Sequence, residues 1–209
     1  MTNYWARFED KNGNIFRFDT RVYLKPINEP SCSKDVCIGA VIGKNPGSAQ
    51  PSDCNSATLQ PIILDNDKLL PTVKNIMTKA YNEAGIALEE NANGYIQILN
   101  LFYLCEKSIR MAKERIKNYQ PNYPICCSEG NNFNFILYAW GGPKDGLGCF
   151  KKRFFNNMRV KNNIWFDRNA REIKYTIPDE NGFAKHIQGL SHEFIVPGIV
   201  EILRKPVIL

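Results

Sequence analysis

The sequence predicts a layered α/β fold, in which an N-terminal β-hairpin precedes a central, mostly parallel sheet of four strands. Two observations predict it. Continuous apolar runs, typical of strands buried on both faces, alternate along the chain with helical patterns. The 209 residues are 44% apolar, which is enough to bury a core without disulfide or metal support.

The N-terminal hairpin is predicted over residues 4–27. Aromatic and polar residues alternate there, and Asn12-Gly13 supplies a turn between two β-prone runs. Pro26 and Pro30 close the second strand.

The four strands of the sheet are predicted from apolar runs bounded by turn residues. The first covers residues 36–42 and stops at Gly43. The others are expected at residues 95–102, 133–140 and 172–177.

Four helices are predicted between and after these strands. Over residues 65–84 apolar side chains recur every three or four positions, and Gly85 follows as a stop signal. The remaining helices are expected at residues 108–119, 147–158 and 196–203.

The chain reads as one domain, residues 1–209, with a β extension over 1–35, a core over 36–145 and a basic segment over 146–209. It has no run of eighteen apolar residues, and its first residues lack the apolar stretch of a signal peptide. We therefore expect a cytoplasmic monomer without membrane contact. Because no Cys-x-x-Cys pair exists, we expect free thiols, with no metal and no cofactor.

The positive charge is concentrated near the C-terminus. The net charge is +6, and the sequence from Lys151 onward contains eleven basic and six acidic residues. Aromatic residues interleave with the basic ones, a pattern that suits a phosphate backbone and stacked bases, although a solvated basic face over core aromatics would look the same. The candidate DNA-binding residues are Arg153, Arg159, Lys161, Arg168 and Arg171.

Ligands of such sheets bind beyond the carboxyl ends of the strands. After the first predicted strand, the turn at residues 43–48 has two glycines that let backbone amides approach an anion, though it also suits an ordinary strand exit. Asn100 ends the second strand and either ties down a loop or reads the edge of a ligand. The carboxylates of Asp53, Asp65 and Asp67 lie near the first turn in sequence and are also suited to capping.

In chain order, four short motifs resemble those of the uracil-DNA glycosylase superfamily. Residues 43–47 are similar to its first motif in the Gly-x-Asn-Pro-Gly form, and residues 98–100 to the strand that ends in a base-reading Asn. Residues 137–141 resemble its strand ending in Trp-Gly, and residues 186–191 its last motif. An uncharacterised bacterial and phage branch is closer still, sharing Asn-Leu-Phe, Ala-Trp-Gly and a polar–Thr pair, here Asn55 and Thr58.

The resemblance implies a three-layer sandwich and a DNA N-glycosylase. Such an enzyme flips a damaged, deaminated or modified base out of duplex or single-stranded DNA and hydrolyses its N-glycosidic bond. A hypermodified phage base, and hence defence against phage, is one context. The resemblance implies that Asn45 positions the attacking water and that His186 faces the departing base. It implies that Asn100 reads the base edge, that Phe102 or Tyr103 stacks on the base, and that Leu190 with Ser191 contacts the duplex. The residues implied to hold the flipped nucleotide are Gly43, Lys44, Pro46, Gly47 and Ser48.

The last motif departs from the family pattern because it lacks both prolines and the first Ser, and His192 competes with His186. A lone loop histidine is also commonly plain surface. Three other functions remain open on the residues alone: a non-catalytic nucleic-acid binder, a hydrolase of free nucleosides or nucleotides, and an interaction protein.

Overall fold

A computed structural model describes residues 1–47, 50–51, 58–65, 67–87, 93–120, 122–142, 146–156, 158–179 and 182–205. Within these ranges every helix is too short or too polar to cross a lipid bilayer.

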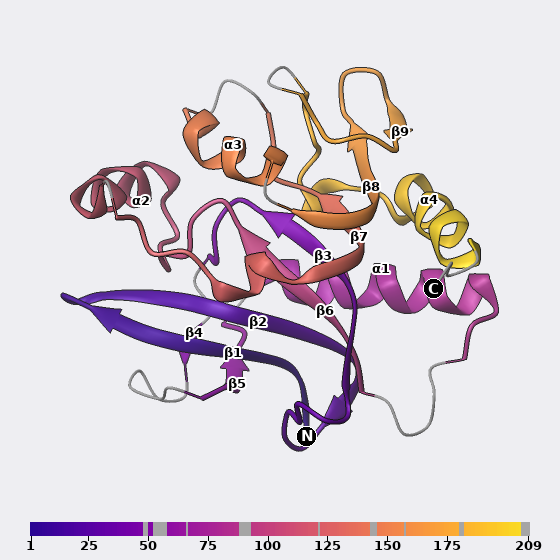
Figure 1. Cartoon of the computed structure of the whole chain (residues 1–209), viewed down its shortest axis with the longest axis horizontal. Coiled ribbons are helices and arrows are strands. Elements are labelled where there is room, and N and C mark those ends of the chain that lie inside the picture. The colour runs from indigo at the N-terminus through magenta and orange to yellow at the C-terminus, as the bar shows by residue number, and fades with distance from the viewer. Residues whose placement is uncertain are drawn as a thin grey trace.

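The described strands form one mixed sheet of nine strands in the order β4-β5-β1-β2-β6-β3-β7-β8-β9 (Figure 1). Their bounds are β1 Thr2–Lys11, β2 Asn14–Ile27, β3 Asp35–Gly43, β4 Gln50–Pro51, β5 Gln60–Ile63, β6 Asn93–Asn100, β7 Asn132–Tyr138, β8 Arg159–Asp167 and β9 Glu172–Lys174.

The α-helices are α1 Leu69–Ala84, α2 Ile109–Ile116, α3 Gly148–Asn156 and α4 His192–Arg204. Gly85 ends α1 in the left-handed conformation at φ 70°, as its position after the periodic run predicts. The Ser108 side chain accepts a hydrogen bond from the backbone N–H of Met111 and thereby caps α2. All four predicted helices are present, with ends that differ by a few residues.

The α/β class is confirmed, but the prediction of a four-stranded, mostly parallel sheet is wrong. In the described residues, strands β6, β3, β7 and β8 are parallel neighbours, whereas the other five pairings of the sheet are antiparallel. The difference arises because the N-terminal hairpin does not stand apart: β2 pairs with β6 and continues the same sheet.

The fourth parallel strand also differs from the prediction. It is β8, which lies in the basic segment, while residues 172–174 form only the short antiparallel edge strand β9. The alternation of charged and apolar residues at the start of β8 concealed a strand whose second half, Ile164 to Phe166, is buried.

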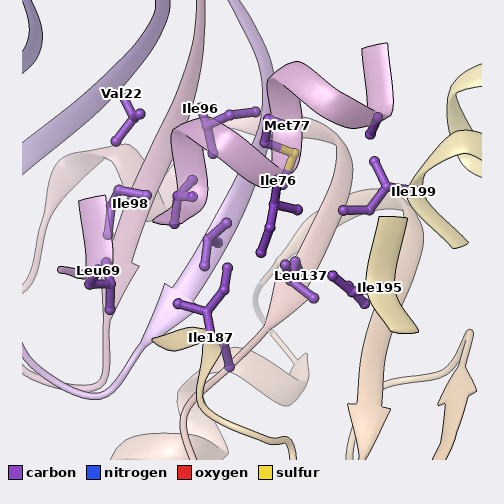
Figure 2. Close-up of a cluster of buried hydrophobic side chains, with 14 of the residues drawn as sticks. Val22, Leu69, Ile76, Met77, Ile96, Ile98, Leu137, Ile187, Ile195 and Ile199 are labelled. Atoms are coloured by element: carbon purple, nitrogen blue, oxygen red, sulfur yellow. The ribbon is translucent and has the colours of Figure 1, made fainter. Parts of the chain in front are cut away.

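Helices cover both faces of the parallel strands. Helices α1 and α4 pack on one face, where Ile98 and Leu137 belong to the core that Figure 2 shows. Helices α2 and α3 pack on the other face, over Ile42 and Tyr138. Because both faces are covered, the carboxyl ends of these strands form the edge on which polar side chains gather.

Candidate functional site

The first two predicted motifs lie side by side at the carboxyl edge of the sheet. Gly43 of β3 is directly opposite Asn100 of β6 in parallel register. A Cβ atom added to Gly43 would lie 3.2 Å from the Asn100 side-chain oxygen. The backbone N–H of Leu101 donates to the Gly43 carbonyl at 3.1 Å, which fixes this pairing beyond the ends of both strands.

The Trp-Gly motif reaches the same edge. The N–H of Ala139 donates to the carbonyl of Ile42 at 2.9 Å, so the chain leaves β7 beside the first turn. At Gly141, where φ is 93°, an added Cβ would lie 3.2 Å from Lys44 Nζ. The Lys44 side chain therefore passes across the Gly141 backbone, and a larger residue at 141 would displace it.

Asn45 anchors the first turn. Its side-chain Nδ2 donates to the backbone carbonyl of Glu106 at 2.8 Å, which ties the turn to the segment that follows β6. Pro46 is buried, and Gly47 adopts a φ of 72° that favours glycine. Ser48, which was expected to contact the nucleotide, lies outside the described residues, as do Asp53 and Asn55.

The segment before α4 brings His186 to this edge. Its neighbour Ile187 is buried and enters the core close to Leu69 at the start of α1 (Figure 2). The N–H of Gly141 donates to the carbonyl of Ala184 at 2.8 Å, and this bond links the segment to the end of β7. The structure therefore brings the last motif together with the other three.

The environment of His186 favours a neutral imidazole. Burial, reinforced by the positive charge of Lys44, lowers the pKa of His186 below its usual value, while the nearby Asp67 opposes the shift. Its Nδ1 accepts a hydrogen bond from the backbone N–H of Gln188 at 3.4 Å, so the neutral ring carries its proton on Nε2. His192 is instead the first residue of α4, and the geometry favours His186 as the site histidine.

Two further side chains belong to this cluster. Asp67 caps α1, because its Oδ1 accepts the backbone N–H of Leu69 at 2.8 Å. Its Oδ2 lies 3.5 Å from Arg17 Nη1, and the two side chains are only 5% and 1% exposed. The Arg17–Asp67 pair thus places a buried cation and a buried anion beside the start of α1.

Several polar atoms of this cluster are buried and have no hydrogen-bond partner among the residues that the structure describes. They are Arg17 Nε, Arg17 Nη1, Asp67 Oδ2 and Asn100 Nδ2. An unpartnered buried donor or acceptor costs about 1–3 kcal/mol, and natural proteins keep few of them. Arg17 Nη1 and Asp67 Oδ2 face each other as an ion pair, and other buried atoms of this kind lie on Thr20, Arg21, Thr78 and Trp165. Asn100 Nδ2 is the atom of this cluster that lies at the end of a parallel strand, where ligands of such sheets bind.

The role of Arg17 could not be predicted from the sequence. Its position between Phe16 and Phe18 looks like the exposed side of an amphipathic strand, and its partner Asp67 is fifty positions away. Asp67 did carry a signal, because a carboxylate just before an apolar helix pattern predicts a cap.

Three predicted ligand contacts find no support in the structure, because the side chains are engaged in other contacts. Phe102 is fully buried, as Asn100 is, and its ring packs against Phe150 in the core beneath α2 and α3. Leu190 is 5% exposed and belongs to the core beneath α1 and α4, so it cannot project as a wedge. Arg153 forms an ion pair with Glu129 at 2.9 Å and is not available to phosphates.

Arg153 has a different role. Its Nη2 donates to the backbone carbonyl of Asn100 at 2.9 Å, and its guanidinium lies over the ring of Phe154. Glu129, which holds Arg153, also accepts a hydrogen bond from the Tyr103 hydroxyl at 2.6 Å. This network holds the backbone carbonyl of Asn100 in place through Arg153.

The remaining basic residues are divided between the two ends of the sheet. Arg159 and Lys161 begin β8, so they lie at the amino edge, opposite the candidate site. Arg168 and Arg171 are exposed and follow the end of β8, on the side of the candidate site. Ser191 occupies the N-cap position of α4, where its Oγ donates to the Glu193 carboxylate at 3.0 Å and not to the helix backbone.

The sequence and structure were compared with known proteins. No protein-family model, no curated protein and no solved structure matches the chain.

Proposed function

We propose that the chain is a DNA N-glycosylase, which extrudes a base and hydrolyses its N-glycosidic bond to leave an abasic site. The observation that carries the proposal is the buried Asn100 amide, which lies opposite Gly43 at the end of two parallel strands. Within the described part of the chain its Nδ2 has no hydrogen-bond partner. The parallel strands β6, β3, β7 and β8 with helices on both faces support a counterpart of the uracil-DNA glycosylase sheet.

Asn100 is suited to read the edge of a base. A side-chain amide offers two donors and one acceptor, and here the donor group is desolvated before any ligand arrives. A base carbonyl that meets Nδ2 would accept a hydrogen bond from a buried donor, so the gain on binding is larger than at an exposed amide.

His186 is suited to stabilise the departing base. Bond cleavage leaves negative charge on the base. A neutral imidazole that is protonated on Nε2 can donate a hydrogen bond to that charge and remain neutral itself. One well-placed donor to a developing anion contributes about 3 kcal/mol to lowering the barrier. Lys44, whose charge already acts on His186, adds a positive potential at the same place.

Asn45 has a narrower part in this mechanism. Its Nδ2 is engaged by Glu106, so the turn is held in place and the side-chain oxygen is the group that is suited to orient the attacking water. The exposed Arg168 and Arg171 supply phosphate contacts at the same edge of the sheet.

The deciding experiment incubates the full chain with duplex and single-stranded DNA that carries uracil, hypoxanthine or modified bases, and then scores alkali-labile sites. We expect strand breaks with the wild type and at least a ~100-fold lower rate for Asn100→Ala and for His186→Ala. His192→Ala is the matched control and should cleave at the wild-type rate.

Each other outcome points elsewhere. DNA binding without abasic sites on any substrate would indicate a non-catalytic binder. Cleavage of free nucleosides alone would indicate a small-molecule hydrolase. Wild-type cleavage by Asn100→Ala would overturn the proposed site.

A further inference from the structure

A second cluster of reactive side chains lies away from the candidate site. Asp19 of β2 meets the adjacent cysteines Cys126 and Cys127, which are more than a hundred positions further along the chain. One ligand atom from each residue lies within 4.8 Å of the other two. Among the described residues this is the group of His, Cys, Asp and Glu side chains with a spacing suited to a metal ion.

The distances within the cluster are close to those of a tetrahedral metal site. Asp19 Oδ1 lies 3.2 Å from Cys126 Sγ and 3.6 Å from Cys127 Sγ, and Asp19 Oδ2 lies 3.8 Å from Cys127 Sγ. Around a zinc ion with Zn–S near 2.3 Å and Zn–O near 2.1 Å, a sulfur and an oxygen ligand are about 3.6 Å apart. The carboxylate and the two sulfurs are therefore already gathered as the ligands of one such ion would be, with the three ligand atoms within 4.8 Å of one another.

The surroundings hold the carboxylate and leave one side open. Arg7 Nε lies 3.2 Å from Asp19 Oδ2, and the Ser128 hydroxyl donates to Oδ1. Such hydrogen bonds to a ligating carboxylate are the usual support around metal sites. Cys126 is buried whereas Cys127 is exposed, so a cation can reach the cluster from solvent and keep a water as a fourth ligand.

We propose that Asp19, Cys126 and Cys127 bind a thiophilic divalent cation, Zn²⁺ or Cd²⁺. Two thiolates with one carboxylate favour these ions over Mg²⁺ or Ca²⁺, which take oxygen ligands. Binding forms two metal–sulfur bonds and one metal–oxygen bond, and the two thiol protons pass to solvent. No electron transfer takes place.

The cation would act as a clamp rather than as a catalyst. It joins β2 to the 3₁₀ turn Cys127–Gly130, and this turn carries Glu129, the residue that holds Arg153. Arg153 in turn donates to the Asn100 carbonyl. Metal binding therefore stiffens the support behind Asn100, although the binding itself does not depend on the proposed glycosylase activity.

The test uses the reduced, metal-free full chain titrated with Cd²⁺ and followed by the ultraviolet charge-transfer band of cadmium thiolates. We expect one equivalent to bind and the thermal midpoint of unfolding to rise with the concentration of Cd²⁺. Cys127→Ser and Asp19→Asn should each weaken binding at least ~10-fold. Cys149→Ser and Cys32→Ser, which remove exposed thiols elsewhere, serve as controls and should bind as the wild type does.

Two results would overturn the proposal. One is the absence of a charge-transfer band in the wild type at a large excess of Cd²⁺. The other is an affinity that is equal in the wild type and in Cys127→Ser, whose exposed side chain can be changed without disturbing the core. Abasic-site formation is scored separately, so failure of the metal site and failure of the proposed activity are distinguishable.

Discussion

Gly43 and Asn100 lie opposite each other at the ends of β3 and β6, and the space beside Gly43 is occupied by the Asn100 side-chain oxygen. A methyl group at position 43 would lie 3.2 Å from that oxygen, which is closer than most carbon–oxygen contacts allow. The turn that begins at Gly43 and the amide that is proposed to read a base are thus fitted to each other.

The first prediction follows from this contact. Gly43→Ala should push the Asn100 amide aside by a few tenths of an ångström and lower base excision at least ~10-fold, since misplacement on this scale is costly in catalysis. The free energy of unfolding should change by less than about 1 kcal/mol, because alanine reduces the entropy of the unfolded chain. Gly148→Ala, where the added Cβ meets no atom within 4 Å, is the control. It should leave base excision unchanged and raise the free energy of unfolding by up to about 1 kcal/mol, because alanine is favoured in helix α3.

The second prediction concerns the buried pair of Arg17 and Asp67. Arg17→Met leaves a buried carboxylate without its cation and should destabilise the fold by about 3–5 kcal/mol. Asp67→Asn keeps a side-chain acceptor for the backbone N–H of Leu69 but removes the charge that faces Arg17. In urea unfolding the double variant should be more stable than the sum of the single effects predicts, by about 1–3 kcal/mol. Additive effects would show that the two side chains do not interact.

The third prediction concerns the protonation of His186. Because burial lowers its pKa, the imidazole should titrate below pH 6.5 in the folded chain. The folded state then binds fewer protons than the unfolded state, so this group's contribution to stability is complete above pH 6.5 and is lost as the pH falls through the folded pKa.

The measurement is an NMR titration of the imidazole signals in His192→Gln, which leaves His186 as the single histidine. Lys44→Met removes the positive charge that helps to lower the pKa, and should move the titration of His186 upward. A midpoint above 6.5 in the His192→Gln background would contradict the buried, neutral state.

The fourth prediction uses the two ends of the sheet as its own control. Arg168→Glu with Arg171→Glu reverses two exposed charges on the side of the candidate site and should weaken DNA binding for all sequences. The slope of log affinity against log salt should become shallower by about 2. Arg159→Glu with Lys161→Glu makes an equal charge change at the opposite edge, and should leave both quantities nearly unchanged. Equal losses in the two double variants would show that the DNA path is not at the carboxyl edge.

The sequence was informative where local chemistry decides the structure. The Asn12-Gly13 turn forms with φ values of 56° and 76°, because these residue types tolerate the left-handed region. The strands β3, β6 and β7 could be predicted because a strand that is buried on both faces is a nearly continuous apolar run in the sequence.

The sequence was uninformative where a distant partner decides the structure. From the sequence, Arg153 is a candidate phosphate ligand, but in the fold it donates hydrogen bonds to Glu129 and to the Asn100 carbonyl. Leu190 has the residue type that the family motif requires, but its position in the core beside α1 and α4 is set by packing. The convergence of the four motifs was predicted from the rule that parallel strands present their carboxyl ends together, whereas the presence of Arg17 was not.

The attachment of β2 to β6 bears on how the protein can be shortened. A fragment starting at Asp35 would retain the four parallel strands, yet it would uncover the edge of β6, an apolar strand whose free amides and carbonyls would invite intermolecular pairing. It would also strip Asp67 of its counter-charge. Deletion mapping that treats the hairpin as a dispensable appendage should therefore yield aggregates instead of a minimal domain.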